Sequence, residues 1–367
     1  MPRSRYIMVG GFLGAGKTTA LFRLAERLKS QGLRVGLITN DQSYGLVDTQ
    51  LLASAFPVEE ITGGCFCCRF QSLVEASQRL TSENQPDVFL AEPVGSCTDI
   101  KATVDYPLRR FYGDDYSVAP YSVLVDPLRA ARVLGIEQGQ SFSEKVLYIY
   151  HKQLEEADVL VINKTDLLTA DQLARLTQAL AERYPRATIR AISARDGTGI
   201  DSWHEDLQVT TANTTSAMDV DYDVYAEGES LLGWLNGQFE LTSDQEFDGN
   251  ALLAMLAVDL RNDLQARAIP IAHLKMTVTP DQGSDLAVVN VVSNESAPEL
   301  YHRLQEPLEA GKLTLNLRAE GAPEHLQEAI EKVFLTLEPK TQVRLKPIHL
   351  ESFRPGRPMP THRFVAV

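Results

Sequence analysis

Residues 11–18 constrain the fold of this chain more than any other segment. They satisfy the phosphate-binding pattern G-x-x-x-x-G-K-[ST], between an apolar run at residues 6–9 and helical spacing of apolar residues over 17–31. In that context the backbone N–H groups at the start of the helix face an anion. The sequence therefore predicts a strand, a phosphate loop and a helix; the alternative is a glycine-rich turn with a chance lysine.

Short apolar runs then alternate with helical patterns. The expected strands are residues 6–9, 34–39, 88–91, 121–125, 159–162 and 188–192. This alternation predicts an α/β domain, a P-loop NTPase parallel sheet with helices on both faces. Ligands collect at the carboxyl ends of such strands. The polar residues or glycines expected there are Gly11, Thr39, Glu92, Asp126, Asn163 and Ser193.

The pattern changes near residues 208–217, which are rich in Thr, Ser and Asn. We expect a P-loop domain over 1–207, a linker over 208–219 and a smaller α+β domain with an antiparallel sheet over 220–367. Its expected strands are 235–241, 271–279, 286–292 and 313–318, and its expected helices are 249–266, 298–308 and 323–335. Prolines keep the tail at 353–360 extended.

The phosphate loop supplies most of the predicted nucleotide contacts. Lys17 can bridge the β- and γ-phosphates, and the Thr18 hydroxyl can ligate Mg²⁺. Backbone groups of the loop wrap the phosphates; the residues concerned are Gly11, Gly14, Ala15, Gly16, Lys17, Thr18 and Thr19.

A second motif selects the base. Asn163, Lys164 and Asp166 follow the strand at 159–162. The Asp166 carboxylate only accepts hydrogen bonds, and guanine offers two donors on one edge where adenine does not. Lys164 can lie along the base, and Asn163 can tie the loop to the phosphate loop. After the next strand, Ser193 and Ala194 could place the Ala194 N–H on guanine O6. Helix capping by Asp166 and an ordinary loop at 193–197 are the alternatives.

The strand at 88–91 ends at Glu92, with Gly95 three residues on. The Glu92 carboxylate can hold the Mg²⁺ shell or position the attacking water, and the Gly95 N–H can sense the γ-phosphate. The alternative is an exposed loop glutamate. Asp126 is a second candidate of this kind.

Three of the four cysteines, Cys65, Cys67 and Cys68, fall within four positions. Thiolates suit zinc, Cu(I) and similar ions, and Cys-x-Cys lets two sulfurs converge on one ion. The alternative is a buried loop in which cysteine acts as a small apolar residue. Whether the adjacent Cys67 and Cys68 bind the same ion stays open. We expect Cys97 to be a plain core or loop cysteine.

The composition of the chain argues against several classes of protein. A net charge of −14 argues against a broad nucleic-acid surface, and no apolar run reaches the length of a membrane span. Residues 1–5 leave no room for a signal peptide before the phosphate loop. Clustered cysteines do not resemble a disulfide framework, so a reducing, cytoplasmic location is expected. His151 and His273 are expected to be structural.

These motifs together resemble the CobW-like metallochaperone GTPases, relatives of UreG and HypB. The resemblance rests on residues 10–19 (GGFLGAGKTT), residues 63–68 (GGCFCC), Glu92-x-x-Gly95 and Asn163-Lys164-x-Asp166, over about the first 200 residues. It implies weak GTP hydrolysis with Lys17 and Glu92 as catalytic residues, Mg²⁺ at Thr18 and Glu92, and a transition metal at Cys65, Cys67 and Cys68.

The chain departs from the family pattern in two places. The family usually has Asn-Glu-Phe-Gly where this chain has Asn40-Asp41-Gln42-Ser43, so the acid is one carbon shorter; Asp41 or a group from a partner would complete the metal shell. The seven histidines are scattered, and the histidine-rich loop of many relatives is missing.

The sequence therefore predicts a GTPase that binds and delivers Zn²⁺ or another transition metal such as Co²⁺, with GTP and Mg²⁺ as cofactors. One alternative is a GTPase chaperone that gates a corrinoid or other metallocofactor, and another is a small-molecule kinase. The expected partner is a client metalloenzyme or cofactor-dependent enzyme, a homodimer is allowed, and neither nucleic acid nor membrane is expected.

Overall fold

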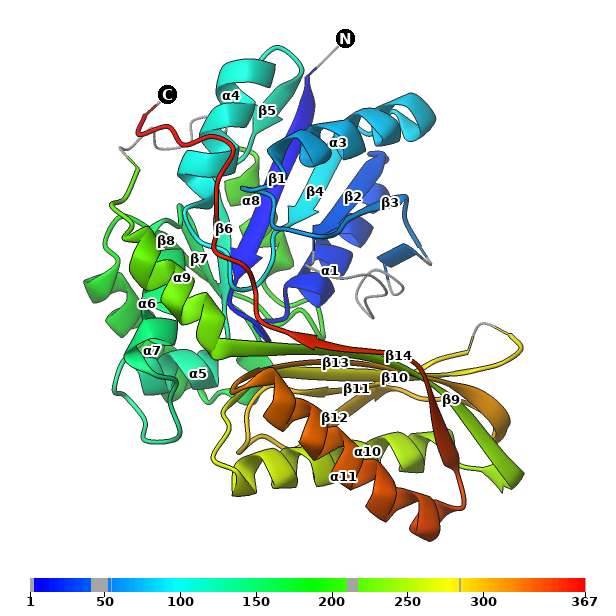
Figure 1. Ribbon diagram of the computed structural model, residues 1–367. Helices are drawn as coiled ribbons and strands as arrows, with labels where there is room; N and C mark the ends of the chain where they lie inside the picture. Colours follow the sequence, from blue (N-terminus) through cyan, green and yellow to red (C-terminus); the bar gives the residue numbers. More distant parts are fainter. Residues whose placement is uncertain (1–2, 41–51, 54, 210–216, 284, 367) are drawn as a thin grey trace. The chain divides into compact units, whose positions relative to one another are not determined.

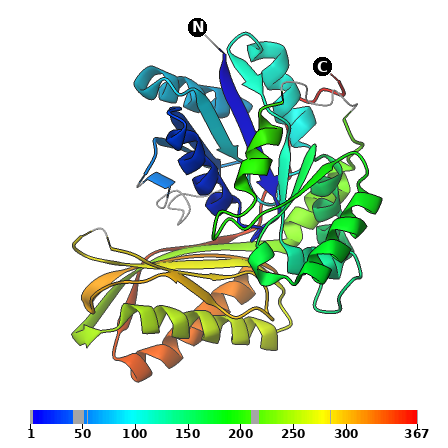
Figure 2. The same cartoon turned by 180° about the vertical axis from the view of Figure 1, so that it is seen from behind.

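The computed structural model describes residues 3–40, 52–53, 55–209, 217–283 and 285–366. These residues form two compact units (Figures 1 and 2). The first comprises the described residues up to 226 together with 357–366, and the second comprises 227–356. The candidate ligand Asp41 lies outside the described residues, as does most of the predicted linker.

The first unit is built on an eight-stranded sheet with the order β3-β2-β4-β1-β6-β7-β8, to which β5 adds by pairing with β1. Every described pairing in it is parallel. The strands are β1 (Ser4–Gly11), β2 (Val35–Asn40), β3 (Val58–Ile61), β4 (Val88–Glu92), β5 (Tyr116–Val118), β6 (Ser122–Val125), β7 (Val159–Ile162) and β8 (Thr188–Ala191).

Helices cover both faces of this sheet, as the sequence predicts. On β1, Ile7 joins the apolar cluster of α1 and α8, whereas Tyr6 faces the opposite way and its hydroxyl lies 3.5 Å from Ser77 Oγ of α3. The alternation follows from the two-residue period of a strand. The helices are α1 (Lys17–Ser30), α3 (Phe70–Asn84), α4 (Tyr106–Tyr112), α5 (Pro127–Val133), α6 (Glu144–Glu155), α7 (Ala170–Arg183) and α8 (Ile200–Leu207). A further helix, α9 (Tyr222–Leu231), contains the boundary between the two units.

The second unit is a six-stranded antiparallel sheet with the order β12-β11-β10-β13-β9-β14. Its strands are β9 (Leu232–Phe247), β10 (Ile271–Pro280), β11 (Ala287–Val291), β12 (Glu299–His302), β13 (Leu308–Glu320) and β14 (Arg344–Phe353). The helices α10 (Gly249–Ala266) and α11 (Pro323–Thr341) pack their apolar residues against alternate residues of β9, β10 and β13. The predicted α+β class with an antiparallel sheet is therefore confirmed.

The predicted helix at 298–308 is wrong. Residues 299–302 form the edge strand β12, in which Glu299 and Leu300 pair with Asn290 and Val289 of β11. Hydrogen bonding to the neighbouring strand β11 outweighs the helix propensity of so short a segment. Pro298 and Pro307, on either side of it, also limit the length of any helix there.

The boundary between the units also differs from the expected one. The second unit begins at 227 rather than 220, and the last residues of the chain belong to the first unit rather than to the second. The tail returns because its backbone and side chains bond to the first unit: Thr361 N donates to Cys67 O at 2.8 Å and Phe364 N to Ala102 O at 2.9 Å. In Figure 1 the tail is the red segment that passes β6 and ends near α4.

None of the helices in the described part of the chain combines the length and apolar character needed to cross a lipid bilayer.

Candidate nucleotide and metal site

The phosphate loop joins the end of β1 to the start of α1. Gly16 takes a left-handed conformation with φ of 85°, and a Cβ atom there would lie 2.5 Å from Asn163 Nδ2. Only glycine fits such a position. No side chain caps the start of α1, and its first turn holds no acidic residue. The helix therefore presents its first backbone N–H groups and the positive end of its dipole at the loop, as an anion requires.

Lys17, Thr18 and Glu92 meet beside this loop. The Thr18 hydroxyl donates to Glu92 Oε2 at 3.1 Å, and Lys17 Nζ lies 3.8 Å from Glu92 Oε1. Lys17 and Thr18 are buried. Gly95 is close as well, since a Cβ atom on it would lie 3.0 Å from Lys17 Nζ. The ends of β1 and β4, neighbours in the sheet, thus bring the four predicted residues together.

The loop after β7 is fastened to the phosphate loop. Asn163 Nδ2 donates to Ala15 O at 2.9 Å, and Lys164 Nζ donates to Gly14 O and to Asp126 Oδ2, each at 2.7 Å. Lys164 itself is left-handed, with φ of 57°. Burial would raise the pKa of the Asp126 carboxyl, but Lys164 and Arg129 outweigh it and hold that pKa below its usual value. Asp126 therefore acts as a buried anion that positions Lys164.

Asp166 lies against the loop that follows β8. Ser193 Oγ donates to Asp166 Oδ1 at 2.8 Å, and Arg195 Nη1 lies 3.3 Å from Asp166 Oδ2. The Ala194 N–H donates to Asn163 Oδ1 at 3.1 Å. The structure therefore brings the two predicted motifs into direct contact, with Ser193 orienting the carboxylate.

Arg129 was missed by sequence reasoning. Its guanidinium donates to the Leu13 carbonyl of the phosphate loop and lies over the rings of Phe12 and Phe142, 5.1 and 5.3 Å from their centroids. It is buried, and burial lowers its pKa. This arginine is engaged in holding the loop.

The three clustered thiols converge. The Sγ atoms of Cys65 and Cys67 lie 2.8 Å apart, those of Cys65 and Cys68 3.3 Å, and those of Cys67 and Cys68 3.8 Å. Cys65 and Cys67 are buried and Cys68 is half-buried. Among the residues the structure describes, this is the group of His, Cys, Asp and Glu side chains that is close enough to hold one metal ion.

Asn40, at the end of β2, fixes the loop that carries these thiols. Its Nδ2 donates to Ile61 O at 3.0 Å and Gly64 O at 2.8 Å, and its Oδ1 accepts from Phe66 N at 2.9 Å. The adjoining Gly63 and Gly64 have φ of 73° and 149°. A buried amide that bonds three backbone groups of one loop holds that loop in a single conformation.

The hydrogen bonds among the three thiols shift their pKa values in opposite directions. Hydrogen bonds from Cys67 and Cys68 lower the pKa of the Cys65 thiol well below its usual value. The bond to Cys65 raises the pKa of Cys67 well above the usual value and that of Cys68 to about 11. Cys65 is therefore the most acidic of the three thiols, and a soft cation that binds the cluster displaces protons from it.

The last residues of the chain lie along the thiol loop. Met359 N donates to Cys68 Sγ at 3.2 Å, and Thr361 Oγ1 donates to Cys68 O at 3.1 Å. Arg363 Nε bonds Asp99 Oδ2 at 2.7 Å, and Tyr222 donates to the same atom at 2.7 Å. Asp99 is buried and left-handed, with φ of 64°. Sequence reasoning read this tail as extended and gave no signal for its contacts.

Replacing Thr361 with alanine should make Cys68 more reactive. The change removes one hydrogen bond to the Cys68 carbonyl, worth about 1 kcal/mol, so alkylation of Cys68 in the reduced protein should rise by up to about fivefold. Peptide mass spectrometry after brief alkylation measures the rate. Thr336→Ala is the matched control, because its hydroxyl bonds Val333 O within α11. Equal rates in the two variants would show that the tail does not restrain the thiol loop.

Two histidines have structural surroundings. His151 Nδ1 lies 2.8 Å from the Tyr184 hydroxyl, and burial lowers its pKa. His273 lies on β10 of the second unit, within the sheet.

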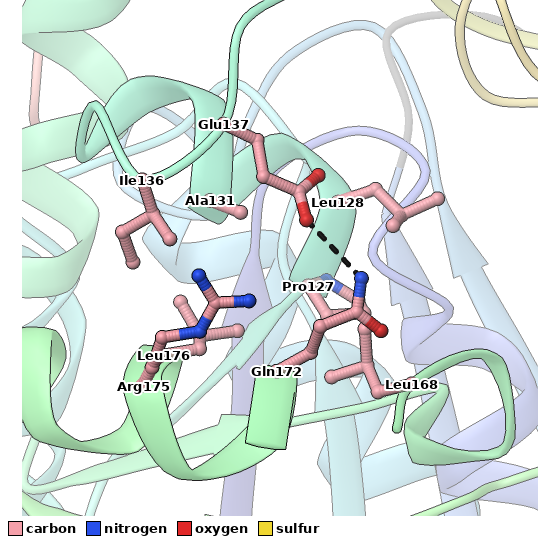
Figure 3. Close-up of a pocket in the computed structure, with 9 residues that line it drawn as sticks. All are labelled: Pro127, Leu128, Ala131, Ile136, Glu137, Leu168, Gln172, Arg175 and Leu176. Carbon is pink, nitrogen blue, oxygen red and sulfur yellow. Dashed lines mark hydrogen bonds between the residues drawn. The ribbon is translucent and has the colours of Figure 1, made fainter. Parts of the chain in front are cut away.

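A small pocket lies between α5 and α7 (Figure 3). It is mostly apolar, and across it Gln172 Nε2 donates to Glu137 Oε1 at 3.2 Å. Its volume of ≈ 10 Å³ is room for about one water molecule. None of the predicted site residues lines it.

The sequence of this chain is similar to those of known proteins over part of its length. The family model "CobW/HypB/UreG, nucleotide-binding domain" matches residues 5–190. The zinc chaperone CobW of Sinorhizobium sp is 27% identical over 210 residues, which are 52% of this chain and 58% of that protein. The zinc chaperone YeiR of Escherichia coli K12 is 29% identical over 170 residues, 46% of this chain and 48% of that protein. The chain thus spans about half the length of these curated relatives.

Among solved structures, the Zn(II)-bound YjiA GTPase from E. coli is similar over 91% of this chain and 99% of that chain, with 15% identity and a TM-score of 0.38. A TM-score this low supports no detailed comparison. The family model, in contrast, covers half of the chain and includes the phosphate loop, the thiol loop and residues 163–166. The chain belongs to the CobW/HypB/UreG family.

Proposed function

We propose that the protein is a GTP-binding and GTP-hydrolysing metallochaperone, which couples its nucleotide state to the binding and delivery of a transition metal of the zinc or cobalt class. The observation that carries the proposal is the convergence of three thiols, within 4.8 Å of one another, in the same unit as the phosphate loop. The names of the curated relatives, zinc chaperones, support the choice of cargo.

The nucleotide half of the proposal assigns a role to each contact. The uncapped start of α1, with Gly11, Gly14, Ala15 and Gly16 before it, receives the phosphates, and Lys17 neutralises the β- and γ-phosphate charge. The Asp166 carboxylate accepts from the guanine N1–H and amino group, and Ser193 orients it. Asn163 and Lys164 hold the base-reading loop against the phosphate loop.

The magnesium site we propose comprises the Thr18 hydroxyl and the Glu92 carboxylate. These are hard oxygen ligands, and their 3.1 Å separation fits one ion with its waters. Magnesium supplies charge for the phosphate oxygens. Glu92 also positions the water that attacks the γ-phosphate, and the Gly95 N–H senses that phosphate. We expect slow intrinsic turnover, because Arg129, beside the loop, is already committed to the Leu13 carbonyl.

The metal half of the proposal uses Cys65, Cys67 and Cys68 as soft ligands. The buried Cys65 and Cys67 retain the ion, whereas the half-buried Cys68 is the thiol that a client apo-metalloenzyme reaches first. Free thiols at close range require a reducing compartment, which favours the cytoplasm.

A titration of the reduced protein with Co²⁺ tests the coupling. We expect a non-hydrolysable GTP analogue with Mg²⁺ to tighten Co²⁺ binding about tenfold relative to GDP, and Co²⁺ to tighten binding of the analogue by the same factor, because linkage is reciprocal. Thiolate-to-cobalt charge-transfer absorbance follows the metal.

Cys67→Ser should erase the effect and leave GDP affinity nearly intact, since Cys67 lies outside the phosphate loop. Ser77→Ala, a change on α3 away from the thiols, is the control. Equal Co²⁺ affinity in the apo, GDP and GTP-analogue forms would rule out nucleotide-gated delivery and reduce the cysteines to a static site.

A further inference from the structure

The last residues of the chain bond directly to the thiol loop. The Met359 N–H donates to Cys68 Sγ at 3.2 Å. Thr361 adds two bonds to the backbone of the loop, from its N–H to Cys67 O at 2.8 Å and from its hydroxyl to Cys68 O at 3.1 Å. Cys68 is the half-buried member of the three thiols, whereas Cys65 and Cys67 are buried. The tail therefore contacts the thiol through which a bound ion is most accessible.

An aromatic cluster seats the tail beside this loop. The His362 ring packs against both Phe70, at the start of α3, and Phe111 of α4, with 5.2 Å between the ring centroids in each case. The Phe364 ring is nearly parallel to that of His362, and the Arg110 guanidinium lies over the Phe364 ring, 4.8 Å from its centroid. Such ring contacts add to the stabilisation that burial of apolar area provides. The tail is therefore a packed segment of the first unit.

An ion pair fixes the far end of the tail. Arg363 Nε donates to Asp99 Oδ2 at 2.7 Å, and Arg363 Nη2 donates to Met218 O at 2.9 Å. The Asp99 side chain is 1% exposed, and the Tyr222 hydroxyl donates to the same oxygen at 2.7 Å. Asp99 also has φ of 64°, a conformation that a residue other than glycine keeps only where its surroundings enforce it. A charge-assisted bond shielded from water is stronger than an exposed one, so Arg363 anchors the tail firmly.

From these contacts we propose that the tail at 357–366 is a strap on the metal site. The Met359 N–H supports the Cys68 thiolate when that sulfur binds the ion, as hydrogen bonds around a ligand sulfur do. The Arg363–Asp99 pair keeps the tail in place, so the ion leaves slowly until the tail is released. This proposal rests on the proposed function and adds to it a control over the release of the metal.

The first test compares Met359→Pro with Met359→Ala in the reduced, Co²⁺-loaded protein. Both variants lose a side chain that is 73% exposed, but only proline also removes the N–H. Position 359 lies between Pro358 and Pro360, in an extended segment that suits proline. In Met359→Pro we expect the thiolate-to-cobalt charge-transfer band at lower energy, because a sulfur without this donor gives up charge more readily. Co²⁺ affinity should fall about tenfold. Met359→Ala should match the wild type in both measurements.

The second test measures transfer of Co²⁺ to excess EDTA, followed as the loss of charge-transfer absorbance. Arg363→Ala should transfer the metal about tenfold faster than the wild type, because it removes a buried charge-assisted bond. Arg357→Ala is the matched control in the same tail. Arg357 pairs with Asp223 at 2.6 Å, but the two side chains are 57% and 75% exposed, and such a pair contributes little. GDP affinity should be nearly unchanged in both variants, which establishes that they are folded.

The outcomes separate the strap from the metallochaperone function. If Met359→Pro and Met359→Ala had the same band energy and affinity, the tail would not support the Cys68 thiolate. If Arg363→Ala and Arg357→Ala released the metal at the same rate, the ion pair would not hold the strap. A wild type that showed no thiolate-to-cobalt absorbance would instead contradict the proposed function itself. If Arg363→Ala failed to fold, the two Met359 variants would decide alone, since they change only an exposed position of the tail.

Discussion

Replacing Lys17 with alanine should abolish measurable GTP hydrolysis. The Lys17 ammonium group is buried, 3.8 Å from Glu92, and the neighbouring cations Lys164 and Arg129 are already bonded to carbonyl groups of the phosphate loop. Removal of one preorganised group that stabilises the developing charge costs about 10²–10³ in kcat. Because the intrinsic rate is expected to be slow, a loss of this size would leave no activity in a single-turnover assay of phosphate release.

Lys29→Ala provides the matched control. Lys29 lies in the last turn of the same helix, where it is exposed and lies over the Phe56 ring, 5.3 Å from the centroid. The two substitutions make the same change of residue at opposite ends of α1, so they share the change in intrinsic helix propensity, and only the interaction with the helix dipole differs in sign. Hydrolysis by Lys17→Ala at the wild-type rate would mean that the phosphate loop is not the hydrolytic centre.

The first sheet could be predicted because buried parallel strands read as short apolar runs between helical patterns. Two strands of this sheet were not predicted from the sequence. β3 (Val58–Ile61) carries Glu59 and Glu60 in its middle, and β5 (Tyr116–Val118) has three residues, too few to show a period. Their pairing depends on neighbours that the sheet supplies, and local sequence does not encode it.

The candidate site was predictable where a motif stays within one loop and its flanking elements. Lys17, Thr18 and Asn163 belong to such motifs, and the sheet brings them together because parallel strands end at one edge. Contacts between distant segments left no such signal. The tail at 357–366 shows no sequence pattern that specifies its bonds to Cys67 and Cys68.

Replacing Asp166 with asparagine should change the preferred base from guanine to xanthine. The carboxylate accepts two hydrogen bonds in our proposal, and each buried donor left without a partner costs about 1–3 kcal/mol. GTP affinity should therefore fall by about 10²-fold or more. Xanthine carries a carbonyl oxygen where guanine carries its amino group, so the asparagine amide can donate to it. Competition of GTP, xanthosine triphosphate and ATP for a fluorescent guanine nucleotide measures the change.

Asp171→Asn is the control, since Asp171 is an exposed residue at the start of α7 that pairs with Arg175. It should leave all three affinities unchanged. The neighbours of Asp166 explain why the swap can succeed: Ser193 Oγ, which lies 2.8 Å from Oδ1, can donate to an amide oxygen as readily as to a carboxylate. The bond to Ser193 should therefore keep the side chain in its orientation while the outer atom changes from acceptor to donor, and the exposed Arg195, which loses its acceptor at Oδ2, should turn toward solvent. If the wild type bound ATP as tightly as GTP, Asp166 would not read the base, and the capping role of that residue would be the better explanation.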